Sequence, residues 1–380
     1  MKKNLLCALL CVSMAAVTMV GCGNTDQTTD TTQEEETDDS ASTTDETDDS
    51  ASTADETESA GEGDLTTDKT YCLIVRSAGN PYCQKEADGF KEAIEAQGGT
   101  FVLQEPSAAD AESQITCINN AISQGVDVIA VAANDADALQ PALTEAKNAG
   151  IHVLALDSAT NAESREVFCN QAGITEVGET LMEAVNDIAG GEGKWAILSA
   201  ASTSTNQNSW IESMKSVMTD SKYAGLELVG VYYGDDEYQK SVDQTDAILT
   251  ENPDIKVICA PTTVGIMAAA KVVEDKGLAG SVKVTGLGLP SEMADYIGTS
   301  DSDACPYMFL WNPIDLGKMT GYAAIALENG LITGAEGDCF TTPDGTEYKV
   351  TAAADGGTEI ILGAPYEFNP ENIDDWKDVY

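Results

Sequence analysis

The sequence predicts an α/β protein with parallel sheets, and two observations support this prediction. From residue 69 onward, apolar runs of about four to six residues alternate with helical patterns every thirty residues or so, which is typical of parallel βαβ units. This part of the chain is also a little over 300 residues long, beyond the size at which a single hydrophobic core usually keeps growing. We therefore expect two lobes within residues 69–380.

The expected strands are the short apolar runs, and the expected helices lie between or after them. Strands are predicted at 72–75, 101–103, 126–132, 153–156, 195–198, 228–232, 257–259, 282–285 and 308–311. Helical patterns are found at 84–95, 110–123, 175–188, 209–218, 239–249 and 316–328.

The first 22 residues have the pattern of an export signal. Lys2 and Lys3 precede a mostly apolar run at 5–20, which is too short to span a bilayer, and a small residue, Gly21, stands directly before Cys22. Residues 19–22 resemble the bacterial lipobox, although Met19 stands where leucine is usual. That resemblance implies a signal peptide over 1–21 and a diacylated Cys22 as the first mature residue, anchored in the membrane. The alternative is an ordinary secretory signal followed by a stray cysteine.

An acidic, low-complexity linker follows. Residues 24–68 contain 17 Asp or Glu and no Lys or Arg, and a ten-residue repeat spans 37–46 and 47–56. Such sequence stays extended because like charges repel and apolar area is lacking. We interpret residues 22–68 as a lipid-bearing tether; a segment that folds on binding a partner is the alternative.

Charge and cysteine content narrow the choice of partners. A formal net charge of -46 argues against nucleic acid and against direct adsorption to anionic lipid. Of ten cysteines, Cys7 and Cys11 lie in the signal and Cys22 takes lipid, which leaves seven at irregular spacings. These seven are expected to be mainly buried apolar residues, although export would permit one disulfide. We expect no metal site and no cofactor.

The histidine content argues against an enzyme. The single histidine, His152, lies within the apolar run 151–156 and is expected to be a structural strand residue. Ser-His-Asp and Cys-His catalysis therefore lack their central residue.

The residues that follow the strands predict the ligand. In open α/β sheets the binding crevice lies beyond the carboxyl ends of the strands. The segments there are 76–80, 134–135, 157–158, 202–208, 261–263, 286–290 and 311–312. They are rich in amides, carboxylates and hydroxyls, with Trp and Tyr nearby, which suits a polyhydroxylated ligand. No phosphate-binding glycine motif follows the first strand.

Six short motifs carry a family resemblance that covers 69–380. They are STNQNSW (204–210), GDDEYQKS (234–241), APTTVG (260–265), GLGLP (286–290), FLWNP (309–313) and NIDD (372–375). With these motifs in this order, the chain resembles the type 1 periplasmic binding proteins, the solute receptors of ABC importers. Within that group it is similar to the rhamnose-binding proteins and to their relatives that bind autoinducer 2.

The resemblance implies a ligand site whose residues come from several strand ends. It puts a basic residue, Arg76, after the first strand and a carboxylate, Asp157, after the fourth, both of which would clamp ligand hydroxyls. The first position is commonly lysine in the family, so Arg76 is a departure. Asn206 matches the rhamnose branch, because the autoinducer branch has Asp there. The complete set of expected ligand residues is Arg76, Asn80, Asp135, Asp157, Asn206, Gln207, Pro261, Thr263, Trp311 and Asn312.

Structural roles compete with ligand binding at three of these positions. Asp157 could cap the following segment, Asn206 could belong to the N-cap region of a helix, and Trp311 could be a core residue. Trp311 and Asn312 are also expected near a chain crossing between the lobes.

The resemblance also implies an architecture and a function. It implies two doubly wound Rossmann-like lobes with parallel sheets, joined by a three-crossover hinge. The first lobe would hold about 69–156 and 313–345, and the second about 157–312 and 346–380. The expected protein is a monomeric, lipid-anchored receptor on the outer face of the cell membrane, with a Gram-positive surface favoured. It would capture L-rhamnose or a similar monosaccharide and deliver it to an ABC permease. Autoinducer 2 uptake and sugar sensing without transport are the alternatives.

Overall fold

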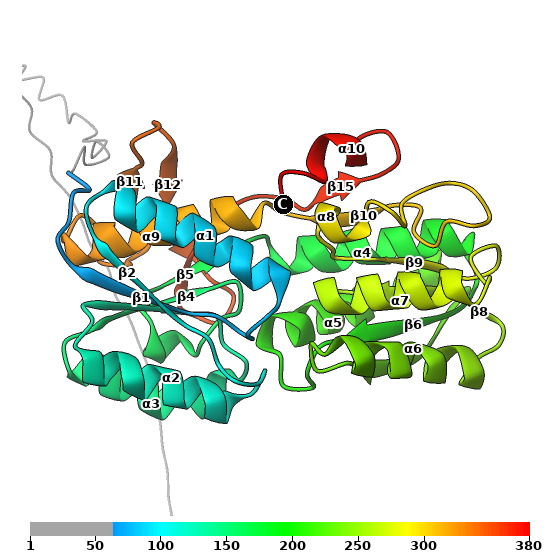
Figure 1. Ribbon diagram of the computed structural model, residues 1–380, viewed down its shortest axis with the longest axis horizontal. Coiled ribbons are helices and arrows are strands. Elements are labelled where there is room, and N and C mark those ends of the chain that lie inside the picture. Colours follow the sequence, from blue (N-terminus) through cyan, green and yellow to red (C-terminus); the bar gives the residue numbers. More distant parts are fainter. Residues whose placement is uncertain (1–63) are drawn as a thin grey trace, which may run out of the picture. The chain divides into compact units, whose positions relative to one another are not determined.

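The computed structural model describes residues 64–380, shown as the coloured ribbon in Figure 1. They belong to a compact unit that spans Glu58–Tyr380. The expected signal peptide, the lipidation site at Cys22 and the linker up to residue 63 lie outside the described residues. None of the helices within 64–380 is both long enough and apolar enough to cross a lipid bilayer.

The end of the expected linker is part of the folded domain. Leu65 is buried, and the N–H of Thr67 donates to the carbonyl of Gln97 at 3.0 Å. Asn329 Nδ2 donates to the Asp64 carbonyl at 2.9 Å. The ordered domain therefore includes residues 64–68, which the sequence assigned to the tether.

The first lobe is built on a seven-stranded sheet with the order β13-β14-β5-β4-β3-β1-β2. Its strands are β1 (Thr70–Ile74), β2 (Thr100–Gln104), β3 (Val128–Val131), β4 (His152–Leu156), β5 (Val167–Asn170), β13 (Thr351–Ala352) and β14 (Thr358–Ile361). All neighbours are parallel except β13 and β14. β3 and β5 are buried throughout, as expected for parallel strands covered on both faces.

Two pairs of helices cover this sheet. The helices are α1 (Pro81–Ala96), α2 (Ala111–Gln124), α3 (Ala136–Asn148) and α9 (Pro313–Glu328), with α1 and α9 on one face and α2 and α3 on the other (Figure 1). The α1 and α9 backbones approach closely at two glycines. A Cβ on Gly89 would lie 2.0 Å from the Ile314 carbonyl oxygen, and one on Gly317 would lie 2.1 Å from that of Glu86. This close packing fixes the amino-terminal end of α1 beside the site.

The second lobe is built on a four-stranded parallel sheet with the order β7-β6-β8-β9. The strands are β6 (Gly193–Ser199), β7 (Leu226–Tyr233), β8 (Ile255–Ala260) and β9 (Lys283–Gly286). The helices are α4 (Ile174–Ala189), α5 (Thr205–Val217), α6 (Tyr238–Glu251), α7 (Thr263–Asp275) and the short α8 (Pro290–Met293). α4 packs with α5, and α6 packs with α7. Helices again cover both faces, so the predicted α/β fold with two parallel sheets is confirmed.

Three chain passages join the lobes within the described residues. The chain leaves β5 for α4 and returns from β10 (Met308–Leu310) to α9. It passes a third time from β14 to β15 (Tyr366–Phe368), which pairs with β10. β10 lies beside the second sheet, since Leu287 and Phe309 form an isolated bridge. This arrangement is the expected three-crossover hinge.

The sheet pairing corrects the expected lobe boundaries. Residues 157–170 and 346–361 were expected in the second lobe, but β5 pairs with β4 and β14 pairs with β5. The first sheet is therefore extended by two further parallel strands, and the chain crosses only after each of them.

All nine expected strands and all six expected helices overlap observed elements. Three observed elements, β5, α3 and α7, were not predicted from the sequence. Nor were the short elements near the carboxyl terminus, among them the hairpin of β11 (Cys339–Thr341) and β12 (Glu347–Lys349) and helix α10 (Ile373–Trp376). Strands of two to four residues in Gly- and Asp-rich sequence have too little hydrophobic periodicity to be recognised.

Candidate functional site

A cleft lies where the carboxyl ends of strands from both sheets meet. Its empty volume is about 320 Å³, including the part that is open to solvent. The residues that line it are Arg76, Asn80, Tyr82, Asp157, Asn206, Gln207, Trp210, Pro261, Thr262, Thr263, Leu287, Leu310 and Trp311. They come from both lobes and from the passage between β10 and α9, which is the position predicted for a ligand crevice.

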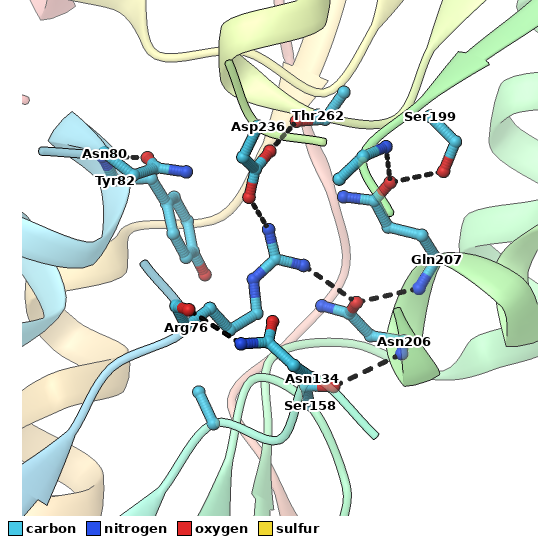
Figure 2. A network of polar contacts seen from close by, with 12 residues as sticks. Arg76, Asn80, Tyr82, Asn134, Ser158, Ser199, Asn206, Gln207, Asp236 and Thr262 are labelled. Atoms are coloured by element: carbon cyan, nitrogen blue, oxygen red, sulfur yellow. Dashed lines mark hydrogen bonds and ion pairs between the residues drawn. The ribbon is translucent and has the colours of Figure 1, made fainter. Parts of the chain in front are cut away.

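Arg76 follows β1 and reaches across the cleft to the second lobe. Its Nη1 donates to Asn206 Oδ1 at 3.3 Å, and its Nη2 donates to Asp236 Oδ2 at 2.5 Å (Figure 2). Burial opposes the charge, but the carboxylates of Asp236 and Asp157 outweigh it, so the pKa of Arg76 is raised. The guanidinium therefore stays charged although its residue is only 5% exposed.

The backbone around Arg76 is fixed by two buried amide side chains. Asn134 Nδ2 donates to the Arg76 carbonyl at 2.8 Å. Gln114 on α2 donates to the carbonyls of Val75 and Ala132, and its Oε1 accepts from the N–H of Asn134. The ends of β1 and β3 are thus tied together, which holds the base of the Arg76 side chain in place.

Asp157 follows β4 and is almost completely buried. Its Oδ1 accepts from the Tyr82 hydroxyl at 3.2 Å, and its Oδ2 accepts from Asn206 Nδ2 at 3.0 Å. Burial raises the pKa of Asp157 to about 6, although the charge of Arg76 and the hydrogen bond from Tyr82 oppose the increase. Its backbone has φ 56°, a left-handed conformation that Asp and Asn tolerate better than most residues.

Asn206 and Gln207 lie in the first turn of α5. Asn206 connects the two charged groups of the first lobe, because its amide accepts from Arg76 and donates to Asp157. The Oε1 of Gln207 accepts from Ser199 Oγ at 2.5 Å and from the N–H of Ala200 at 2.7 Å. Its Nε2 makes no hydrogen bond to the described residues and points toward the cleft (Figure 2).

Loops and helix starts complete the polar part of the lining. Asn80 caps α1 by accepting from the N–H of Tyr82 at 2.9 Å, and its side chain also lines the cleft. Pro261 and Thr262 follow β8, and Thr263 begins α7. Thr262 Oγ1 donates to Asp236 Oδ1 at 2.9 Å.

Aromatic and aliphatic side chains form an apolar wall. Trp311 contacts Tyr82 edge-on, with ring centroids 6.4 Å apart, and Trp210 with centroids 5.7 Å apart. The Trp311 Nε1 donates to the Tyr82 hydroxyl at 2.5 Å. Leu287 and Leu310 continue the lining. Such a wall suits the C–H face of a sugar ring.

The structure brings most of the expected ligand residues together. Eight of the ten line the cleft: Arg76, Asn80, Asp157, Asn206, Gln207, Pro261, Thr263 and Trp311. The N-cap of α5 is Ser204, and Asn206 is a buried residue of the first helical turn.

Asp135 and Asn312 do not line the cleft. Asp135 is the N-cap of α3, where its side chain accepts from the N–H of Ala138. Asn312 is the N-cap of α9 and accepts from the N–H groups of Ile314 and Asp315. Both lie in strand-end segments, but their side chains turn back to satisfy helix N–H groups.

Four polar or aromatic residues were not among the expected ligand residues. Tyr82, Trp210 and Thr262 line the cleft, and Thr262 lies in the strand-end segment 261–263; Asp236 binds Arg76 without lining the cleft. Asp236 follows an expected strand within the GDDEYQKS motif, so the strand-end argument could have found it. Tyr82 and Trp210 lie within helices, and only their packing brings them to the cleft.

Other reactive side chains lie elsewhere. His152 begins β4, at the opposite end of that strand from Asp157, with Nε2 3.7 Å from Glu328 Oε2. All seven cysteines between residues 64 and 380 are free thiols, and six of them are buried. In the same range, no three His, Cys, Asp or Glu side chains are grouped so that they could hold a metal ion.

Comparison with known proteins identifies similar chains. Residues 71–332 match the model of a family described as a periplasmic binding protein domain. The chain is 29% identical over 242 residues to the D-ribose/D-allose-binding protein of Pseudomonas aeruginosa, a match that covers 60% of this chain and 73% of that protein. It is 25% identical over 299 residues to the D-xylose-binding periplasmic protein of Escherichia coli, which covers 77% of this chain and 84% of that one.

Two solved structures are also similar. An ABC transporter solute binding protein from Clostridium phytofermentas with bound L-rhamnose is 69% identical, with a TM-score of 0.82, and the match covers 83% of this chain and 100% of that chain. LsrB from Clostridium saccharobutylicum in complex with AI-2 is 23% identical, with a TM-score of 0.75, over 81% of this chain and 99% of that chain. At the second identity the likeness shows the fold alone.

Proposed function

This chain belongs to the family of periplasmic binding protein domains, and we propose that it is the solute receptor of an ABC importer whose ligand is L-rhamnose or a similar monosaccharide. The sugar would bind in the cleft between the two lobes and leave it chemically unchanged. The protein acts outside the cytoplasm, as members of this family do.

The observation that carries the proposal is the division of the cleft into a polar and an apolar side. Arg76, Asp157, Asn206 and the free Nε2 of Gln207 offer charged and amide groups that can bind several hydroxyls. The side chains of the apolar wall, Trp210, Trp311, Leu287 and Leu310, have no polar atoms other than the indole N–H groups, so they offer little to a sugar hydroxyl. A 6-deoxy hexose has this division itself, because its ring carries hydroxyls and its sixth carbon is a methyl group.

The similarity to the solved protein that contains L-rhamnose supports this choice of sugar. Asn206 supports it further against autoinducer 2. Its amide nitrogen donates to Asp157 and its amide oxygen accepts from Arg76, so both polar atoms of the side chain have a partner. An Asp at this position, as in the autoinducer branch, would place a second carboxylate against Asp157.

Capture follows from the position of the polar groups. Because they come from both lobes, a sugar contacts both only when the lobes are closed, and those extra contacts shift the population toward the closed form. The closed form is the one that a permease would recognise. The likeness to a solved ABC transporter solute binding protein supports delivery to such a permease.

Calorimetric titration of residues 58–380 with a graded set of sugars tests the proposal. L-Rhamnose is expected to bind. L-Mannose, which adds a hydroxyl at the sixth carbon, should bind about tenfold or more weakly because that group would meet the apolar wall. L-Lyxose, which lacks the sixth carbon, should also bind more weakly because it loses apolar contact.

Three outcomes of the titration would change the proposal. No heat with L-rhamnose would remove that assignment, and heat with autoinducer 2 instead would transfer the site to that molecule. A chemical change in the recovered sugar would contradict a purely receptor function.

We also propose that Cys22 carries the lipid that holds the mature monomer at the outer face of the membrane, and we favour a Gram-positive surface. The lipobox-like residues 19–22 and the acidic linker support this anchor, which would keep the receptor near the permease yet free to turn. Growth with labelled palmitate should label the wild-type protein and leave Cys22→Ser unlabelled. Label in the variant, or none in the wild type, would contradict the anchor.

A further inference from the structure

Asp236 forms a buried ion pair between the lobes without lining the cleft. It follows β7 of the second sheet, and its Oδ2 accepts from Arg76 Nη2, which belongs to the end of β1 in the first sheet. Its side chain is only 2% exposed. Its other oxygen, Oδ1, accepts from Thr262. Figure 2 shows the guanidinium of Arg76 between Asp236 and Asn206.

The backbone at this position is strained. Asp235 has φ 53° and Asp236 has φ 54°, so two consecutive non-glycine residues adopt the left-handed conformation. Such residues persist only where the surrounding structure holds them, and they are frequent at binding and switch sites. The side chain of Asp235 points elsewhere, to a half-exposed pair with Lys240. The strained turn therefore has one specific result, which is to direct Asp236 at Arg76.

We propose that Asp236 is a positioning residue that orients the guanidinium of Arg76 for the sugar and holds the two lobes together before the sugar arrives. Its effect on affinity rests on the proposed function, whereas its effect on closure does not. Asp236 itself is not among the residues that line the cleft.

The planar guanidinium explains why arginine stands at position 76. One fork of N–H groups reaches Asp236 and Asn206 at the same time, and both contacts cross from the first lobe to the second. The compact ammonium of lysine is a point charge and does not present two donors in a fixed plane. A lysine at position 76 could therefore not make both of these contacts in the same way.

The ion pair between Arg76 and Asp236 affects sugar affinity through the fraction of receptor that is closed. A bond that forms only when the lobes are closed raises the fraction of receptor that is already closed, and the apparent affinity rises with that fraction. Removal of the Asp236 charge would leave Arg76 buried without its ion partner, which favours opening. Release of sugar should therefore become faster, since mutations in one interface act mostly on dissociation.

Asp236→Asn and Asp235→Asn form a matched pair for the test. Each removes one carboxylate from a left-handed position that Asn tolerates, but only the first lies between the lobes. Small-angle X-ray scattering measures the radius of gyration of residues 58–380 without sugar, and stopped-flow kinetics measure the dissociation of L-rhamnose. We expect Asp236→Asn to have a larger ligand-free radius and about tenfold faster dissociation, and Asp235→Asn to match the wild type in both.

An unchanged radius together with unchanged dissociation in Asp236→Asn would overturn the inference and leave the proposed function standing. If the wild type does not bind L-rhamnose, the proposed function fails, and the scattering comparison still tests the closure. If Asp236→Asn does not fold, Thr262→Val removes the second partner of Asp236 and should enlarge the ligand-free radius by less. Because Thr262 also lines the cleft, only the radius is compared, and an unchanged radius in that variant would also overturn the inference.

Discussion

The amide nitrogen of Asn206 donates to the carboxylate of Asp157 at 3.0 Å, although the two residues follow strands of different sheets. This bond, with that between Arg76 and Asn206, joins the polar ends of both lobes at the place where a ligand would bind. Hydrogen bonds among the cleft residues thus hold their side chains in position. A sugar would therefore meet a largely preformed set of donors and acceptors.

Replacement of Asn206 by Asp is expected to weaken sugar binding. The new carboxylate would lose the donor to Asp157 and place two like charges in a buried space, which raises the pKa of Asp157 further. We expect a loss of affinity of about tenfold to a hundredfold for L-rhamnose, measured by calorimetry. Asn208→Asp, two residues along and bonded to the Ser202 carbonyl near the surface, is the control that should bind like the wild type. Equal losses in both variants would contradict the role given to Asn206.

Sugar binding is expected to weaken as the pH falls below 6. Asp157 has a pKa of about 6, raised chiefly by burial, and only its ionised form makes charge-assisted hydrogen bonds to sugar hydroxyls. Below that pH the carboxyl is protonated before the sugar arrives, so the dissociation constant for L-rhamnose should rise by about tenfold for each pH unit. Calorimetry at pH 5 and pH 7.5 measures this change.

The control for the pH experiment is Asp157→Asn, which also suits the left-handed backbone. It should bind more weakly at both pH values but with little difference between them. A pH dependence that persists in this variant would mean that another group titrates on binding.

Tyr82→Phe is expected to impair the site while leaving the aromatic packing in place. The lost hydroxyl donates to Asp157 and accepts from Trp311 Nε1, so two buried groups would lose a partner. A decrease of about 1–2 kcal/mol in the free energy of binding is expected, with the fold retained. Tyr322→Phe, which removes a half-buried hydroxyl on α9 outside the cleft, is the matched control. Wild-type affinity in the Tyr82 variant would show that its hydroxyl is not needed.

Glu86 is expected to be neutral near pH 7. It is fully buried on α1, and burial together with the nearby charge of Asp157 raises its pKa well above the usual range, although Arg76 opposes this. Neither of its carboxyl oxygens has a hydrogen-bond partner in the part of the chain that the structure describes. Glu86→Gln, which resembles the protonated form, should therefore change the free energy of unfolding at pH 7 by less than about 1 kcal/mol.

The raised pKa of Glu86 also makes the free energy of unfolding depend on pH. The pKa of this carboxyl is higher in the folded chain than in the unfolded chain, where it is about 4.5. Its contribution to stability is therefore fully present at pH values below the unfolded pKa and is lost as the pH rises through the folded pKa. Urea unfolding at pH 5, 6.5 and 8 should show a decline with pH that is smaller in Glu86→Gln. A loss of several kcal/mol in the variant at pH 7 would show instead that Glu86 is ionised and paired.

The sequence predicted the sheets and the strand-end residues well because these depend on local signals. The buried runs that became β1, β3, β4, β6 and β8 are unmistakably apolar, and the parallel arrangement brings Arg76 and Asp157 to one edge. The resemblance to known receptors supplied Asn206 and Gln207, which α5 places in its first turn.

The remaining parts depend on contacts that sequence does not reveal. Asp135 and Asn312 lie in strand-end segments, but each is also the N-cap of the next helix, α3 or α9, and its side chain accepts from N–H groups of that helix. Asp236 reaches Arg76 because of a left-handed turn at two Asp residues, and no local pattern predicts such a turn. The pairing of β14 with β5 joins segments 191 residues apart, so the lobe boundary could not be drawn from periodicity.

Binding of a 6-deoxy sugar between the lobes can be seen in a crystal structure of residues 58–380 with L-rhamnose. We expect the sugar in the cleft, with its hydroxyls on Arg76, Asp157 and Asn206 and its methyl group against Trp210 and Trp311. A sugar bound outside this cleft, or one whose methyl group faces Arg76 and Asp157, would contradict this expectation.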